Sequence, residues 1–348
     1  MKTNHTVLIL ILGILFFSCK KPEEEIPEGG TYDIWILNEG LWNMNNSSIT
    51  AYNTFTKNKI SDIYKYANNN RSLGDVANDM IIYGSKVYVV VNVSNLIDVL
   101  DKNTGVSLKK IESTANQPRS ITSHNGKVYA CYFDGSVVKI DTLSLQIEDT
   151  NQAGRNPDGI CVANNKLYVS NSGGLDYPYY DNTVSVFDLN SFSRIRKIVV
   201  GTNPTRIKAD KNGKVYVVCN GNYSDIAPCL QRINSNSDEV EKTFDLEVVN
   251  FDFYNNSMYF YTYDYSTKST SFQILDLLKD SVINTNFISK NNLPKTPYGI
   301  NINPSTGDIY LTDALDYTST GDVYCYGSDG KKKFRFEAGV IPKKLVFK

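Results

Sequence analysis

A short pattern recurs along most of the chain and constrains the fold more than any other feature. Each clear copy contains a turn with proline, an apolar run, a polar turn and a strand with an aromatic residue at its centre. The clearest copies begin at Pro118, Pro157, Pro204 and Pro297, and weaker ones at Ala77 and Val248. The aromatic markers are Trp35, Tyr88, Tyr129, Tyr168, Tyr216, Tyr259 and Tyr310.

The spacing of these markers predicts the architecture. Neighbouring markers lie 39 to 53 residues apart, as the differences between their numbers show. Four short strands and their turns need roughly 40–45 residues, the length of one propeller blade. Alternating β-branched strands such as Thr183–Asp188 follow the markers, and no long helical period is present. The sequence therefore predicts an all-β fold, a seven-bladed β-propeller with four-stranded antiparallel blades.

The two ends of the repeat region predict how the ring closes. Residues 339–348 begin another copy and stop after one strand, whereas the first copy, near Tyr32, starts at its second strand. Pairing of the carboxy-terminal strand into the first blade would remove two exposed sheet edges. We therefore expect this strand to complete the first blade.

The amino terminus is interpreted as a targeting segment. Lys2 precedes an apolar run of 11 residues, Val7–Phe17, which is too short to cross a bilayer as a helix. A small residue, Ser18, stands directly before Cys19, as in lipoprotein signals. We predict a signal peptide over 1–18, lipidation of Cys19, a Pro/Gly-bearing tether over 19–30 and the propeller over 31–348. The alternative is an ordinary secretory signal that contains a cysteine.

The charge balance and the scarcity of histidine narrow the function classes. The chain carries 36 basic and 37 acidic residues, so it has no cationic excess with which to bind nucleic acid. His5 lies in the predicted signal, which leaves His124 as the one histidine of the mature chain. We therefore expect neither a catalytic triad with histidine nor a His-based metal site, and the sequence has no Cys/His spacing typical of a zinc site. We predict a protein that is not an enzyme and holds no cofactor or metal. The alternative in this class is a lactonase-type propeller with an axial metal at Asp75 and Asp158, although Arg119 and Arg206 at the axis weigh against it.

Long loops rich in Tyr, Trp and Asn predict one working face. In a propeller blade, the connections from second to third strand and from the outer strand to the next blade lie on the same face. Tyrosine offers a rigid apolar surface with a hydroxyl, and asparagine offers both a donor and an acceptor. The composition suits a large amphipathic ligand or a protein partner. The predicted ligand-binding residues are Asn38, Trp42, Asp75, Arg119, Asp158, Tyr177, Tyr179, Tyr180, Arg206, Tyr223, Tyr265, Tyr298 and Tyr317.

Five cysteines remain after Cys19. Cys219 and Cys229 flank one of the long loops on expected neighbouring strands, so a disulfide between them is geometrically feasible. Cys131, Cys161 and Cys325 lie within strand patterns and are interpreted as small buried apolar residues.

Several segments give the chain a family resemblance. They are Leu37-Asn38-Glu39-Gly40, Leu73-Gly74-Asp75-Val76-Ala77, Pro297-Tyr298-Gly299-Ile300, Asp313-Ala314-Leu315-Asp316-Tyr317 and Gly339-Val340-Ile341-Pro342. Through them, the chain resembles the YncE-like β-propeller surface lipoproteins of Bacteroidetes, and within these the BtuG-type cobalamin-binding proteins. The acidic residues after Cys19 resemble the signal that places such lipoproteins on the outer face of the outer membrane.

The resemblance implies capture of cobalamin or related corrinoids by a monomeric propeller, with delivery to a TonB-dependent outer-membrane transporter. Cobalamin would be a ligand and not a cofactor, and recognition would proceed without protein ligation of cobalt, because no histidine is expected on the working face. Some family members have been called surface layer proteins. The alternative is therefore a surface module that binds a glycan or a protein partner with the same face.

Overall fold

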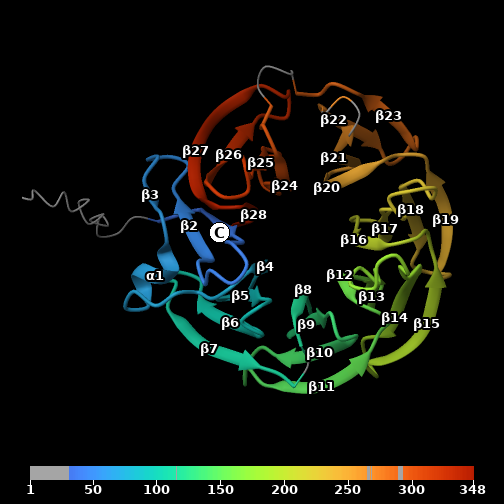
Figure 1. Cartoon of the computed structure of the whole chain (residues 1–348), viewed down its shortest axis with the longest axis horizontal. Coiled ribbons are helices and arrows are strands. Elements are labelled where there is room, and N and C mark those ends of the chain that lie inside the picture. Colours follow the sequence, from blue (N-terminus) through green and yellow to red (C-terminus); the bar gives the residue numbers. More distant parts are fainter. Residues whose placement is uncertain (1–30, 115, 265–266, 268, 289–292) are drawn as a thin grey trace, which may run out of the picture. The chain divides into compact units, whose positions relative to one another are not determined.

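The computed structural model describes residues 31–348 except 115, 265–266, 268 and 289–292; the predicted signal, Cys19 and the tether lie outside these residues. Residues 31–348 form seven four-stranded antiparallel sheets, arranged as the blades of a ring (Figure 1). The predicted seven-bladed all-β propeller is confirmed.

The first blade is built from both ends of this region. From the inside outward it consists of β28 (Pro342–Phe347), β1 (Ile34–Asn38), β2 (Ser48–Tyr52) and β3 (Lys59–Ile60). In β28, Phe347 is opposite Ile34, and Leu345 is opposite Ile36. The predicted closure by the carboxy-terminal strand is confirmed.

The other six blades follow chain order, each with its first strand innermost (Figure 1). Blade 2 is β4 (Ala77–Tyr83), β5 (Lys86–Val91), β6 (Leu96–Asp101) and β7 (Ser107–Glu112), and blade 3 is β8 (Pro118–His124), β9 (Lys127–Tyr132), β10 (Ser136–Asp141) and β11 (Ile147–Gln152). Blade 4 is β12 (Pro157–Ala163), β13 (Lys166–Asn171), β14 (Thr183–Asp188) and β15 (Ser193–Val199), and blade 5 is β16 (Pro204–Ala209), β17 (Lys214–Cys219), β18 (Cys229–Asn234) and β19 (Glu239–Phe244). Blade 6 is β20 (Val248–Tyr254), β21 (Ser257–Asp264), β22 (Ser269–Asp276) and β23 (Ser281–Asn284), and blade 7 is β24 (Pro297–Ile302), β25 (Ile309–Asp313), β26 (Thr320–Tyr326) and β27 (Lys332–Val340).

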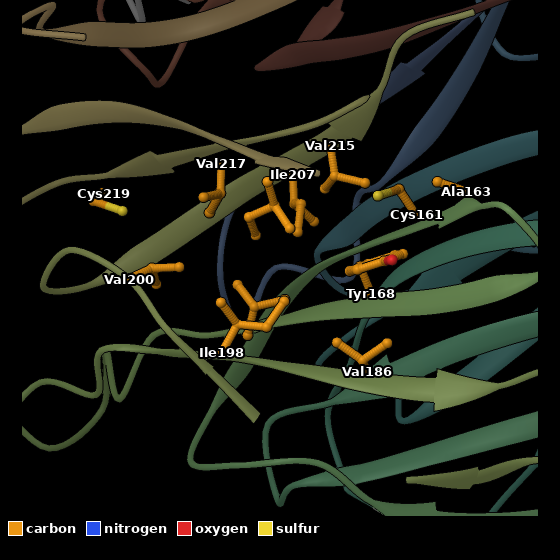
Figure 2. Packing of buried hydrophobic residues seen from close by; sticks show 12 residues of the cluster. Cys161, Ala163, Tyr168, Val186, Ile198, Val200, Ile207, Val215, Val217 and Cys219 are labelled. Carbon is orange, nitrogen blue, oxygen red and sulfur yellow. The ribbon is translucent and has the colours of Figure 1, made fainter. Parts of the chain in front are cut away.

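The hydrophobic core lies between the blades. Each described apolar cluster joins two neighbours, as between blades 4 and 5, where Tyr168, Val186 and Ile198 pack against Ile207 and Val217 (Figure 2). Strand alternation sends every second side chain to one face of a blade, so both faces of an interior sheet must be apolar. The marker aromatics lie on the second strands, which places them within this packing.

Among the described residues, one helix interrupts the all-β pattern. Helix α1 (Ile63–Ala67) lies between β3 and β4 and is capped by Asp62, whose side chain accepts from the Lys65 amide. Tyr64 is buried, and its hydroxyl donates to Asp98 over 2.9 Å. Five residues are too few to show helical periodicity, so the sequence pattern did not predict this helix. Within residues 31–348 as described, no helix is long and apolar enough to cross a membrane.

All seven inner strands share an irregularity that aims side chains toward the axis. In each, the pairing with the second strand shifts register just after the first residue. A β-bulge of this kind bends the strand and redirects a side chain. The second residues of the inner strands are Asn78, Arg119, Asp158, Thr205, Val249, Tyr298 and Lys343, and the third residues are Asp79, Ser120, Gly159, Arg206, Asn250, Gly299 and Lys344.

Two of the third residues are glycine for a steric reason. A Cβ on Gly159 would lie 2.5 Å from the Thr205 carbonyl oxygen, and a Cβ on Gly299 would lie 1.9 Å from the Lys343 carbonyl oxygen. The backbone of the next blade thus approaches too closely for any side chain. This contact explains the Pro-x-Gly form of the repeat at Pro157 and Pro297.

Asp79 ties three blades together at this level. Its carboxylate pairs with Lys344 of blade 1, and its Oδ2 accepts from Ser120 Oγ over 2.7 Å and from the Ile121 amide over 3.0 Å in blade 3. Burial alone raises the pKa of Asp79, but Lys344 and these hydrogen bonds outweigh burial and hold the pKa below the usual range. The carboxylate therefore contributes to the closure of the ring.

Replacing Asp79 with Asn is expected to lower the free energy of unfolding by about 2 kcal/mol at pH 7, because the partly exposed Lys344 loses its partner and the buried hydrogen bonds to Asp79 lose their charge. Since the pKa is depressed in the folded state, this stabilisation is present above the usual aspartate pKa and is lost as the pH falls through the folded value. Urea unfolding at pH 7 and pH 3 measures both effects. The difference between wild type and Asp79→Asn should shrink at pH 3. The exposed Asp245, replaced in the same way, serves as the control and should change stability little.

Candidate functional site

A cavity of about 1080 Å³ follows the axis of the propeller. Its wall consists mainly of inner-strand side chains, with loop residues at each end. We call the face with the β1–β2, β13–β14, β17–β18 and β25–β26 loops the upper face, and the opposite one the lower face. Tyr180 and Tyr223 line the cavity at its upper end, whereas His124, Asn164 and Asn165 line it at its lower end. The size is at or above the upper limit of typical small-molecule pockets.

Four ion pairs lie at the wall of this axial cavity. The pairs are Arg119 with Asp158, Lys208 with Asp252, Lys343 with Glu39, and Lys344 with Asp79. In the first, Arg119 Nε lies 2.9 Å from Asp158 Oδ1, and the guanidinium also lies 4.9 Å from the Phe133 ring centroid. Although burial raises the pKa of the Asp158 carboxyl, Arg119 more than offsets this and lowers it overall. Three of the four pairs join neighbouring blades, so they brace the wall of the cavity.

A second polar group surrounds Tyr298. Its hydroxyl donates to Glu39 Oε2 over 2.6 Å, and its ring lies edge-on to Tyr317 with centroids 6.0 Å apart. Burial, followed by the charge of Glu39, raises the pKa of Tyr298, which therefore stays protonated as a donor. Lys343 lies 3.4 Å from the same Glu39 oxygen. Glu39 thus fixes both a phenol and an ammonium group at the cavity wall.

Tyrosines form a row along the rim above blades 4 and 5. The rings of Tyr177 and Tyr180 are 6.1 Å apart, and those of Tyr180 and Tyr223 are 6.0 Å apart, both edge-on. Tyr177 and Tyr179 are about three-quarters exposed, at 73% and 76%. Edge-to-face contacts hold these rings in place, and Tyr177 and Tyr223 remain mostly exposed and open to a ligand. The β13–β14 and β17–β18 loops therefore present an organised aromatic surface beside the cavity.

The structure brings six of the predicted ligand-binding residues to the axial cavity: Arg119, Asp158, Tyr180, Arg206, Tyr223 and Tyr298. Trp42, Tyr177, Tyr179 and Tyr317 are exposed on upper-face loops. Tyr265 lies outside the described residues. Asn38 and Asp75 are buried.

Asn38 has an internal role that the sequence did not reveal. Its Nδ2 donates to Ser48 Oγ and Thr50 Oγ1, both over 3.0 Å, and its Oδ1 accepts from the Gly339 amide. Asn171 makes the same set of contacts in blade 4, with Gly154 as the amide donor. Since its polar atoms are already used, we remove Asn38 from the candidate ligand contacts and assign it to the blade scaffold.

Asp75 also supports a loop instead of lining the cavity. Its Oδ1 accepts from the Asn43 amide over 3.1 Å, next to the exposed Trp42. We therefore interpret Asp75 as positioning the β1–β2 loop.

The sequence reasoning missed Lys343 as a cavity residue. It follows Pro342 at the start of β28 just as Arg119 follows Pro118 at the start of β8. Aligning the closing strand with the other inner strands would have found it.

Cys219 and Cys229 lie directly opposite each other at the base of the β17–β18 loop. Both are free thiols in the structure, and their facing positions keep a disulfide between them geometrically feasible. A hydrogen bond from Cys219 lowers the pKa of Cys229 to about 7. Cys131, Cys161 and Cys325 are buried, as predicted.

Over the described part of the chain, no group of three or more His, Cys, Asp or Glu side chains is arranged to hold a metal ion.

Comparison with known proteins establishes the fold alone. No protein-family model matches the chain, and no curated protein matches it. A quinonprotein alcohol dehydrogenase-like protein from Bacteroides thetaiotaomicron is similar at a TM-score of 0.67 and 16% identity, covering 91% of this chain and 78% of that one. Hydrazine synthase from Kuenenia stuttgartiensis is similar at a TM-score of 0.61 and 17% identity, covering 73% of this chain and 77% of that one. The computationally designed protein Ika8 is similar at a TM-score of 0.55 and 12% identity, covering 78% of this chain and 90% of that one.

Proposed function

We propose that this propeller is a non-enzymatic, lipid-anchored protein of the outer-membrane surface that captures cobalamin or a related corrinoid for a TonB-dependent transporter. The observation that carries the proposal is the upper end of the axial cavity. There, the tyrosine row meets a polar wall that contains Arg119, Asp158 and Tyr298. A corrin is a broad ring rimmed with amide side chains, so it needs both an aromatic surface and hydrogen-bonding groups.

The position of the histidine supports a ligand held without a protein bond to cobalt. His124 lies at the lower end of the cavity, with its Nε2 3.3 Å from Asn165 Oδ1. The tyrosine, asparagine and arginine side chains of the upper face offer a flat apolar surface and hydrogen-bonding groups, which suit the ring and the rim amides of a corrin. The resemblance in sequence to surface corrinoid-binding lipoproteins points the same way.

Gel filtration of recombinant residues 20–348 mixed with cyanocobalamin tests the proposal. We expect the red corrin absorbance to co-elute with the protein at a one-to-one ratio. If the corrin elutes separately at micromolar protein, the corrinoid proposal is wrong. Binding of a glycan to the same surface would then support the alternative of a glycan-binding module.

A further inference from the structure

Arg206 is the one cation of the axial cavity that lacks an ion-pair partner among the described residues. The other four, Arg119, Lys208, Lys343 and Lys344, each have a carboxylate within 4 Å. Nor does the Arg206 side chain make a hydrogen bond to any residue that the structure describes. Five cationic groups therefore line the cavity, and four of them pair with a carboxylate on its wall or, in the case of Glu39, beside it.

The neighbouring blades explain why Arg206 is unpaired. It is the third residue of its inner strand, β16, and the residues at this position in the adjacent blades are Gly159 and Asn250. Neither can supply a negative charge. In contrast, Lys344 has Asp79 at the same position of the next blade and pairs with it.

The positive charge of Arg206 affects the pKa values of other groups in the cavity. Burial lowers the pKa of Lys343, and the charges of Arg119 and Arg206 lower it further against the opposing effect of Glu39. The side chain of Asp158 is already engaged by Arg119 and feels Arg206 only at longer range. An unneutralised guanidinium in a partly buried site is unfavourable, and an added anion would relieve it.

We infer that Arg206 forms a subsite for an anionic group, a carboxylate or a phosphate, of a ligand that enters the axial cavity from the upper face. The inference rests on the proposed function in that a ligand occupies this cavity. The planar fork of arginine can donate two parallel hydrogen bonds to either kind of oxyanion, which gives the subsite orientation as well as charge. The four existing pairs remain intact when the anion binds, because Arg206 belongs to none of them.

Weak anion binding can be measured without the natural ligand. Residues 20–348 are added to inorganic phosphate or to ¹³C-labelled succinate in chloride buffer at constant ionic strength. Binding is measured as broadening of the ³¹P line of phosphate or of the ¹³C line of succinate. We expect broadening with at least one of the two, and a loss of affinity of about tenfold in Arg206→Met. Broadening by phosphate alone identifies a phosphate subsite, and broadening by succinate alone identifies a carboxylate subsite.

Two variants provide the controls. Arg155→Met removes an upper-face arginine that already pairs with Asp176 at 2.9 Å, so it should leave the anion response unchanged. Arg206→Lys keeps the charge without the fork and should lose less affinity than Arg206→Met. We expect Arg206→Met to melt at the wild-type temperature, since no ion pair is broken; should it fail to fold, Arg206→Lys decides the matter.

The subsite is overturned if neither anion broadens with the wild-type protein, or if Arg206→Met responds as the wild type does. These results are independent of cobalamin. An anion response that requires Arg206, together with no binding of cyanocobalamin, would overturn the corrinoid proposal and keep the subsite. Binding of cyanocobalamin without any anion response would keep the corrinoid proposal and overturn the Arg206 subsite.

Discussion

Ending the chain at Ile341, which removes β28, is expected to abolish the cooperative unfolding transition or to lower the melting temperature by more than about 10 °C. Blade 1 would lose its inner strand, and β1 would be left as an open edge beside the axis. Leu345 and Val346 are buried, and burial of two such side chains contributes about 4 kcal/mol. The ion pair between Lys344 and Asp79 would be lost as well, and so would the hydrogen bond that the Leu345 amide donates to Asn301 Oδ1. Circular dichroism during heating measures the effect.

A point substitution separates closure from a general effect of truncation. Leu345→Ser places a hydroxyl in the cluster between blades 1 and 7 and should cost about 3 kcal/mol. The same change at Ile283, which is 54% exposed on the outer strand β23, should cost little. A truncated protein that melts at the wild-type temperature would contradict the closure of the ring by β28.

Replacing both Tyr180 and Tyr223 with Ala is expected to weaken cyanocobalamin binding by at least about 100-fold. The two rings contact each other and line the upper end of the axial cavity, so their removal takes away apolar area, phenol groups and the packing that orders the row. Stability should change little, because Tyr223 is mostly exposed. Calorimetric titration of the double variant gives the dissociation constant directly.

Tyr66 provides a matched control for this double variant. It is 60% exposed on α1, which lies on the outer side of the ring (Figure 1), and it does not line the axial cavity. Tyr66→Ala should therefore bind cyanocobalamin as the wild type does. If the double variant also retains wild-type affinity, the tyrosine row is not part of the ligand site.

The sequence pattern was sufficient to predict the architecture, because residues that lie close together in the sequence define each propeller repeat. Most blades repeat a proline turn, a polar hairpin turn and a buried aromatic such as Tyr168 or Tyr216, and the incomplete copies at the two ends predict the closure. The helix α1 escaped this reasoning because it spans little more than one turn.

The candidate site was predicted only in part, because a sequence shows residue type and not depth. Asn38 and Trp42 belong to the same expected loop and looked equally suited to bind a ligand, yet Asn38 ends β1 in a buried scaffold contact and Trp42 is exposed. Lys343 was missed because the closing strand was interpreted for its pairing and not for its side chains. The unpaired state of Arg206 depends on residues of two other blades, Gly159 and Asn250, and only the three-dimensional arrangement relates them.

Calorimetric titration of residues 20–348 with cyanocobalamin tests the central claim, which is that the upper end of the axial cavity captures a corrinoid. The account predicts saturable binding at a one-to-one ratio that is lost in the Tyr180→Ala, Tyr223→Ala variant and kept in Tyr66→Ala. Absence of binding heat at several temperatures, with no corrin retained by the protein, would contradict it.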